Sequence, residues 1–127
     1  MSDYKSAKEI ASKSLYYIDG LASAREAIDK MKQHGVDTLI IKKRNEQDAN
    51  GILVVADIVR GVILPDLSLD EVSVYEIMSK PVISVPATLN ARYVPRLLAK
   101  AKINVAPVEE NGNYIGIVHL RDILFSL

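Results

Sequence analysis

The chain has 127 residues, of which 49% are hydrophobic and 25% are charged, so it can build a packed core. Sixteen basic residues balance sixteen acidic ones, which argues against a dedicated binder of nucleic acids or membrane surfaces. The chain contains no cysteine, which excludes disulfides, thiolate metal sites and a cysteine nucleophile.

The first eight residues are polar and charged, unlike a signal peptide. No apolar run approaches the roughly 20 residues that are needed to span a bilayer. We therefore expect a cytoplasmic globular protein with neither a membrane nor a nucleic acid as its partner.

An internal repeat organises the whole chain. At an offset of 67 positions, residues of the first copy recur in the second: Ser6, Glu9, Ile10, Ser12 and Lys13 fall on Ser73, Glu76, Ile77, Ser79 and Lys80. Beyond the connection between Lys42 and Asn50 the offset falls to 65, so the first copy carries two extra residues there. Surface connections tolerate such insertions at little cost.

In the first copy, the predicted strands are Leu15–Ile18, Thr38–Lys42 and Gly51–Val55. A helix is predicted between the first two strands. It starts at Ser23, whose hydroxyl can accept a bond from an amide of the first turn, and Gly35 is placed to end it. A terminal helix is predicted after Asp57.

In the second copy, the predicted strands are Val82–Val85, Asn104–Glu109 and Tyr114–Leu120. Asn90 is the predicted cap of the first helix, and Pro95 near its start is expected to remove one bond and bend it. Asn111-Gly112 predicts a tight hairpin turn. Again a helix is expected to follow an aspartate, here Asp122.

The predicted fold is therefore α/β, made of tandem β-α-β-β-α repeats. We place the first repeat at residues 6–64, a linker at 65–73 and the second repeat at 74–127. A unit of about 60 residues buries so little surface that it is only marginally stable alone. Two copies that share an interface would form a pseudo-two-fold pair with equivalent clefts.

The ordered set of elements resembles a pair of cystathionine-β-synthase-type (CBS) domains, a Bateman module. The resemblance rests on the repeat order, on Gly51…Asp57 and Gly116…Asp122, and on the segment Ile77-Met78-Ser79-Lys80-Pro81-Val82. It covers nearly the whole chain. It implies a regulatory module that binds an adenosine compound (AMP, ADP, ATP or S-adenosylmethionine) in clefts between the repeats. It also implies a homodimer and an effector protein of unknown identity.

The resemblance assigns ligand-binding roles residue by residue. The implied positions are Ile40, Gly51 and Asp57 in the first copy, and Pro107, Gly116, Ile117, His119, Arg121 and Asp122 in the second. The aspartates would accept bonds from ribose hydroxyls. The family's Ser or Thr position is Val54 in the first copy and His119 in the second, and both depart from the pattern. His119 and Arg121 can meet a phosphate, so the second cleft is expected to be preferred.

Each site residue also has a structural explanation. Asp57 and Asp122 can cap helices, and Gly51 and Gly116 can serve the hairpin geometry. Neither a phosphate loop, nor a nucleophile elbow, nor metal-ligand spacing is present, so we expect no enzyme, no catalytic residue, no metal site and no cofactor beyond an adenosine nucleotide. The alternative function is a ligand-free module for dimerisation or docking on a partner protein. The loss of Ser/Thr at Val54 and His119 favours this alternative.

Overall fold

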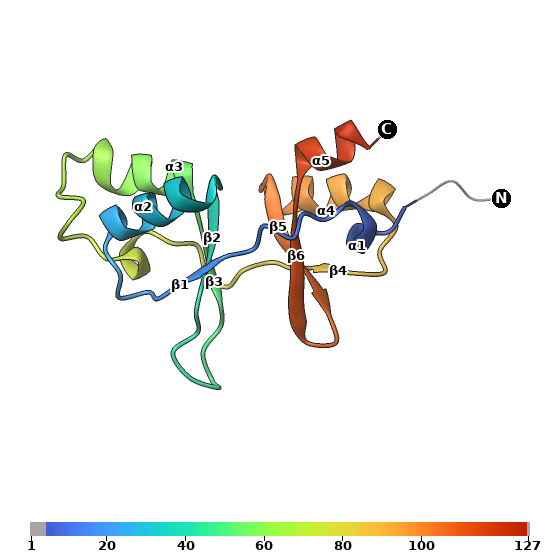
Figure 1. Ribbon diagram of the computed structural model, residues 1–127, viewed down its shortest axis with the longest axis horizontal. Coiled ribbons are helices and arrows are strands. Elements are labelled where there is room, and N and C mark those ends of the chain that lie inside the picture. The colour runs from blue at the N-terminus through green and yellow to red at the C-terminus, as the bar shows by residue number, and fades with distance from the viewer. Residues whose placement is uncertain (1–4, 127) are drawn as a thin grey trace. The chain divides into compact units, whose positions relative to one another are not determined.

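The computed structural model describes residues 5–126, which form two compact α/β units. The first unit, Tyr16–Val82, contains Asp57 and is called the Asp57 unit. The second, the Asp122 unit, combines residues 5–15 with residues 83–126. Figure 1 traces the elements of both units along the chain. Both units mix helices with a three-stranded sheet, as the sequence predicts.

The sheet of the Asp57 unit has the order β1-β2-β3. Its strands are β1 (Tyr17–Ile18), β2 (Thr38–Ile41) and β3 (Gly51–Val54). β1 runs parallel to β2, and β2 pairs antiparallel with β3. β2 is buried on both faces, which explains why its sequence is a continuous apolar run rather than an alternating one.

Helices flank this sheet. The helix α2 (Ala24–His34) begins with a capping box between Ser23 and Glu26 and ends at Gly35, whose φ of 64° suits glycine. The helix α3 (Val55–Ile58) continues directly as a π-helix, η1 (Val59–Ile63).

A 3₁₀ turn, η2 (Val74–Glu76), completes the Asp57 unit. The core of the unit collects buried aliphatic side chains from α2, β2, β3 and η1, among them Met31, Leu39, Leu53 and Val62.

The Asp122 unit has the sheet order β4-β5-β6, with the same parallel and antiparallel pairings. Its elements are α1 (Ala7–Ile10), β4 (Val85–Pro86), the 3₁₀ turn η3 (Ala91–Tyr93), α4 (Val94–Ala101), β5 (Val105–Glu110), β6 (Asn113–His119) and α5 (Leu120–Phe125). Asn90 caps η3, as predicted. Asn111 and Gly112 both have positive φ, as the predicted tight turn requires. Pro95 was expected to remove one hydrogen bond of the helix, but it sits in the first turn of α4, where a backbone amide has no partner within that helix.

The leading segment of each repeat, which is the stretch before its first strand, pairs with the sheet of the other repeat. Ser12 forms two backbone hydrogen bonds with Ile117 of β6, both of 2.8 Å. At the equivalent positions Ser79 forms two with Ile52 of β3, both of 2.9 Å. In Figure 1 the blue segment α1 therefore lies beside the orange and red elements of the second copy. Each compact unit joins most of one repeat to the leading segment of the other.

The first strand of each repeat is shorter than predicted, and in the second it begins later. In the Asp57 unit the amide of Ile40 donates to the carbonyl of Tyr16 at 2.9 Å, which anchors β1. The equivalent residue in the second copy is Pro107, which has no amide N–H to donate. β4 accordingly pairs only from Val85 onward, opposite Val108.

Candidate functional site

At the strand-to-helix junction of the Asp57 unit, the carboxylate of Asp57 accepts a hydrogen bond from the backbone. β3 ends at Val54 in an extended conformation, and α3 starts at the next residue. The Val54 amide donates to Asp57 Oδ2 at 2.9 Å. Asp57 is thus the third residue of the helix rather than the residue before it, and its carboxylate reaches back to cap the first turn.

The second oxygen of this carboxylate is also engaged. Arg60 Nη2 lies 3.3 Å from Asp57 Oδ1, one helical turn further along. The Asp57 side chain is 8% exposed, whereas that of Arg60 is 67% exposed. Both carboxylate oxygens of Asp57 therefore have partners within the Asp57 unit.

The junction at Asp122 has the same backbone geometry. The His119 amide donates to Asp122 Oδ2 at 2.8 Å, and α5 starts directly after His119. His119 Nδ1 lies 3.4 Å from the same oxygen. Among the described residues 5–126, no hydrogen bond reaches Asp122 Oδ1. The Asp122 side chain is 24% exposed, so part of it reaches solvent.

The neighbours of Asp122 differ from those of Asp57. The residue equivalent to Arg60 is Phe125, which has no charge to offer. Arg121 is exposed on α5, at the position held by Ala56 in the first copy. The His119 side chain is 16% exposed and lies beside the carboxylate. The structure therefore brings His119 and Asp122 into contact, and it places Arg121 on the exposed surface of α5.

The strand residues assigned to the ligand lie deep in their sheets. Ile40 is fully buried in β2, where it pairs with Tyr17 and Ile52. Pro107 in β5 is buried and pairs with Ile117 of β6. Both side chains are therefore inaccessible to solvent in this structure.

The two glycines of the pattern serve a close approach of chain segments. A Cβ on Gly116 would lie 2.7 Å from the carbonyl oxygen of Ser12 and 3.1 Å from the Cβ of Ala11. A Cβ on Gly51 would lie 2.5 Å from the sulfur of Met78 and 3.1 Å from the carbonyl oxygen of Ser79. Each glycine therefore makes room for the exchanged leading segment, and this role requires no ligand.

Two further polar residues belong to the Asp57 junction. Arg60 lies outside the pattern that the resemblance assigns, although its three-residue spacing from Asp57 is the spacing at which helical side chains pair. Thr38 lies directly opposite Val54 in the β2–β3 register. Its buried hydroxyl donates to Asp37 at 3.1 Å, on the strand beside the position where the family pattern has Ser or Thr.

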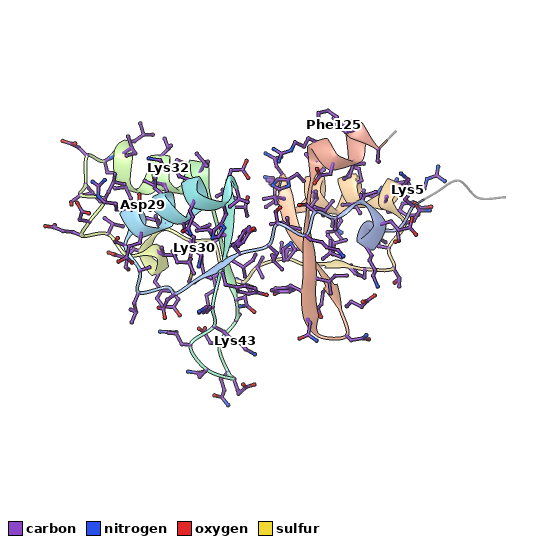
Figure 2. All side chains as sticks on the ribbon, viewed as in Figure 1. Lys5, Asp29, Lys30, Lys32, Lys43 and Phe125 are labelled. Atoms are coloured by element: carbon purple, nitrogen blue, oxygen red, sulfur yellow. The ribbon has the colours of Figure 1, made fainter. Side chains whose placement is uncertain are left out.

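Each unit also carries exposed apolar helix residues. In the Asp57 unit a groove of about 370 Å³ is lined by Ile28, Met31, Lys32, Gly35, Val36, Val55, Ile58, Val59 and Ile63. In the Asp122 unit the end of α5 presents Leu124 and Phe125, and Phe125 is 82% exposed. Figure 2 labels Phe125 on α5. Isolated apolar residues on a surface are common, but a groove beside several of them is typical of an interaction face.

Within residues 5–126 no group of three or more histidine or carboxylate side chains is arranged to hold a metal ion. In the same part of the chain, no helix has the length and apolarity of a membrane span.

The fold and the two junctions define a tandem α/β repeat with one carboxylate at each strand-to-helix turn. The sequence profile of the CBS domain matches residues 7–72 and again residues 74–127. The chain therefore belongs to the CBS domain family, as the resemblance implied, and it contains a CBS domain pair.

Known relatives agree with this assignment. An uncharacterised protein of Methanopyrus kandleri is 32% identical over 117 residues, which make up 91% of this chain and 59% of that protein. The chain thus spans about three fifths of that relative's length. The hexameric CBS-CP12 protein of bloom-forming cyanobacteria is 36% identical, with a TM-score of 0.92 over 98% of this chain and 68% of its own.

A more distant solved structure shares the fold. The cytosolic domain of the Mg²⁺ channel MgtE, in complex with ATP, has a TM-score of 0.74 and 20% identity, over 98% of this chain and 50% of its own.

Proposed function

We propose that this CBS pair is a regulatory, non-catalytic module that binds an adenosine-containing nucleotide through Asp122. The observation that carries the proposal is the state of the Asp122 carboxylate. One oxygen caps the His119 amide, and the other accepts no bond within residues 5–126. A ribose hydroxyl can donate to that oxygen, and hydrogen bonds to a charged group contribute roughly 1.5–3 kcal/mol.

Two neighbours of Asp122 suit a phosphate. Arg121 is exposed on the same helical turn, and a guanidinium can bind phosphate oxygens in a bidentate manner. His119 lies beside the carboxylate and carries a positive charge when protonated. The ATP complex of the similarly folded MgtE domain agrees with an adenosine nucleotide as the ligand class.

A thermal-shift panel tests this function. AMP, ADP, ATP, S-adenosylmethionine, NAD and adenosine are each added to the protein at about 100 times the expected Kd. Specific binding should stabilise the fold by about 2.7 kcal/mol. For a chain of this size, that raises Tm by roughly 10 °C. No shift with any compound, including at ten times higher concentration, would contradict nucleotide binding.

The second candidate function is a module for self-association or for docking on an effector protein. The exposed apolar helix residues favour it, and the hexameric CBS-CP12 relative agrees with self-association. In this proposal the chain forms a cytoplasmic homodimer through an isologous interface. The interface would include the ends of η1 and α5, with Ile63, Leu64, Leu124, Phe125 and Leu127; Leu127 lies outside the described residues.

Sedimentation equilibrium at micromolar concentration tests the association. The unmodified protein should sediment as a dimer, and Phe125→Glu should shift it toward monomer, because the substitution places a charge in the apolar contact. Leu21→Glu is the matched control, since Leu21 is 80% exposed but lies in the turn before α2. A monomeric wild-type protein would contradict the dimer.

A further inference from the structure

The two family-type carboxylates are in different states, and the difference has one cause in the sequence. In the Asp57 unit the Arg60 guanidinium lies 3.3 Å from Asp57 Oδ1. In the Asp122 unit the equivalent residue is Phe125, and Asp122 Oδ1 accepts no bond within the described residues. We propose that Arg60 acts as an internal competitor that lowers the affinity of the Asp57 junction for ribose. This inference rests on the proposed function.

The competition follows from the number of acceptor positions at Asp57. Oδ2 already accepts the Val54 amide at 2.9 Å, which fixes the carboxylate against the first turn of α3. Oδ1 is the remaining oxygen, and Arg60 occupies it. A ribose hydroxyl that donates to Oδ1 must first displace the guanidinium, or share the oxygen with it.

The exposure of Arg60 sets the size of the effect. Its side chain is 67% exposed, so water replaces the carboxylate as its partner at little cost. Exposed ion pairs change an equilibrium by no more than about fivefold. Arg60 therefore weakens ribose binding at Asp57 without abolishing it. The consequence for the module is graded: Asp122 fills first, and Asp57 fills at a higher ligand concentration.

If Arg60 competes with ribose, adenosine binding at Asp57 must depend on ionic strength. Salt screens an exposed ion pair, and the Debye length falls from about 10 Å at 0.1 M to about 3 Å at 1 M. Adenosine has no charge, so salt has little direct effect on its own contacts. Raising the salt concentration should therefore tighten adenosine binding at Asp57, which is the opposite of the effect expected for a phosphate held by cations.

The experiment isolates the Asp57 junction by using Asp122→Asn as the background. Adenosine is titrated by NMR at about 0.05 M and 0.5 M NaCl into this variant, and into the same variant carrying Arg60→Ala, Arg25→Ala or Asp57→Asn. Arg25 is the matched control because it forms an exposed ion pair with Asp70 in the same unit, at 2.6 Å. Thermal unfolding of each variant checks that its fold is retained.

We expect Arg60→Ala to tighten adenosine binding about fivefold at low salt and to remove the salt dependence. Arg25→Ala should change neither, and Asp57→Asn should weaken the binding that the background retains by about tenfold or more. Equal affinities with and without Arg60, or equal effects of Arg60→Ala and Arg25→Ala, would overturn the proposal. If the unmodified protein binds no adenosine compound, the proposed function fails and this inference fails with it. If the unmodified protein binds and Arg60→Ala has no effect, only the inference fails.

Discussion

The Asp57 and Asp122 units share one backbone plan but use its carboxylate differently. In both, an aspartate three residues after the end of a strand accepts the backbone amide at that end, at 2.9 and 2.8 Å. In the Asp57 unit an arginine takes the other oxygen, and apolar Val54 stands at the strand end. In the Asp122 unit His119 stands at the strand end, and Phe125 replaces the arginine at the position equivalent to Arg60. The shared bond is structural, so a functional difference must come from the neighbours.

The two hairpins diverge as well. The longer β2–β3 connection is held by Asp48, which accepts bonds from Lys80 and from the Arg44 backbone, while both cations lie near the Tyr75 ring. Lys43 marks this connection in Figure 2. The β5–β6 hairpin is tighter, and the Lys8–Glu110 ion pair of 3.1 Å ties it to α1. The two repeats thus share the same pairing of segments but differ in the side chains that hold each hairpin in place.

Removing the charge of each carboxylate is expected to give the largest difference in ligand affinity between the two units. Asp122→Asn should weaken binding of an adenosine ligand by about 1.5–3 kcal/mol, since the charge-assisted bond is lost. Asp57→Asn should change the affinity of the tighter site by less than about 0.5 kcal/mol, the range usual for a substitution away from the contact. Calorimetry on both variants measures the difference. Equal losses would mean that the two junctions bind alike.

Substitution of Gly116 is expected to lower the free energy of unfolding more than substitution of Gly51. Gly116→Ala places a Cβ 2.7 Å from a backbone oxygen, which cannot move without shifting the exchanged segment. We expect a loss of about 2 kcal/mol. Gly51→Ala meets mainly the flexible Met78 side chain, and we expect about 1 kcal/mol. Urea unfolding without ligand measures both free energies. A larger loss at Gly51 would reverse this ranking.

The variant His119→Val tests whether the residue at the end of β6 contributes to phosphate binding. His119→Val copies Val54 at the equivalent position and should weaken AMP binding about fivefold, because valine cannot donate a hydrogen bond to the phosphate. Adenosine binding should not change. Calorimetric titrations of AMP and adenosine into both proteins provide the measurement. Identical AMP profiles for the two proteins would show that backbone amides alone hold the phosphate.

The smallest effect is expected from the Asp48 clamp. The hydrogen bond from Lys80, together with the Arg44 backbone amide, holds the pKa of Asp48 well below its usual range. The stability that this clamp contributes is fully present above the unfolded pKa of about 3.9, and it is lost as pH falls through the lower folded value. Asp48→Asn should therefore flatten the stability curve below about pH 4. Unfolding by urea between pH 2 and pH 7 detects the change, and Lys80→Gln should flatten the curve in the same way.

Local signals in the sequence predicted most of the fold. Ser23 and Asn90 cap helices, Gly35 ends α2, and Asn111-Gly112 forms the tight turn, because each property depends on neighbouring residues alone. The late start of β4 could also have been predicted from the sequence, since a proline at the position equivalent to Ile40 cannot donate the anchoring hydrogen bond. The repeat itself carried this information, and comparison of the two copies reveals it.

Other features had no local signal. The pairing of Ser12 with Ile117 joins distant segments, and periodicity says nothing about such partners. Gly116 was explained from sequence by hairpin geometry, whereas the structure shows its contact with Ser12. At the candidate site the aspartates were found, but the state of each carboxylate was not. That state depends on Arg60 in one unit and Phe125 in the other, neither of which lies inside the recognised pattern.

The exchange of leading segments has a consequence for the order of folding. The Asp57 unit is contiguous, from Tyr16 to Val82, whereas the Asp122 unit combines residues 5–15 with residues 83–126. The Ser12–Ile117 pair closes a loop of 105 residues (117 − 12). Contacts so distant along the chain form late, because loop closure precedes any gain from them. During synthesis the leading segment must therefore wait for β6 to emerge. Pulse-labelling hydrogen exchange should show amides of β2 protected before those of Ser12 and Ile117, so the half that carries Asp122 should be the last to become competent.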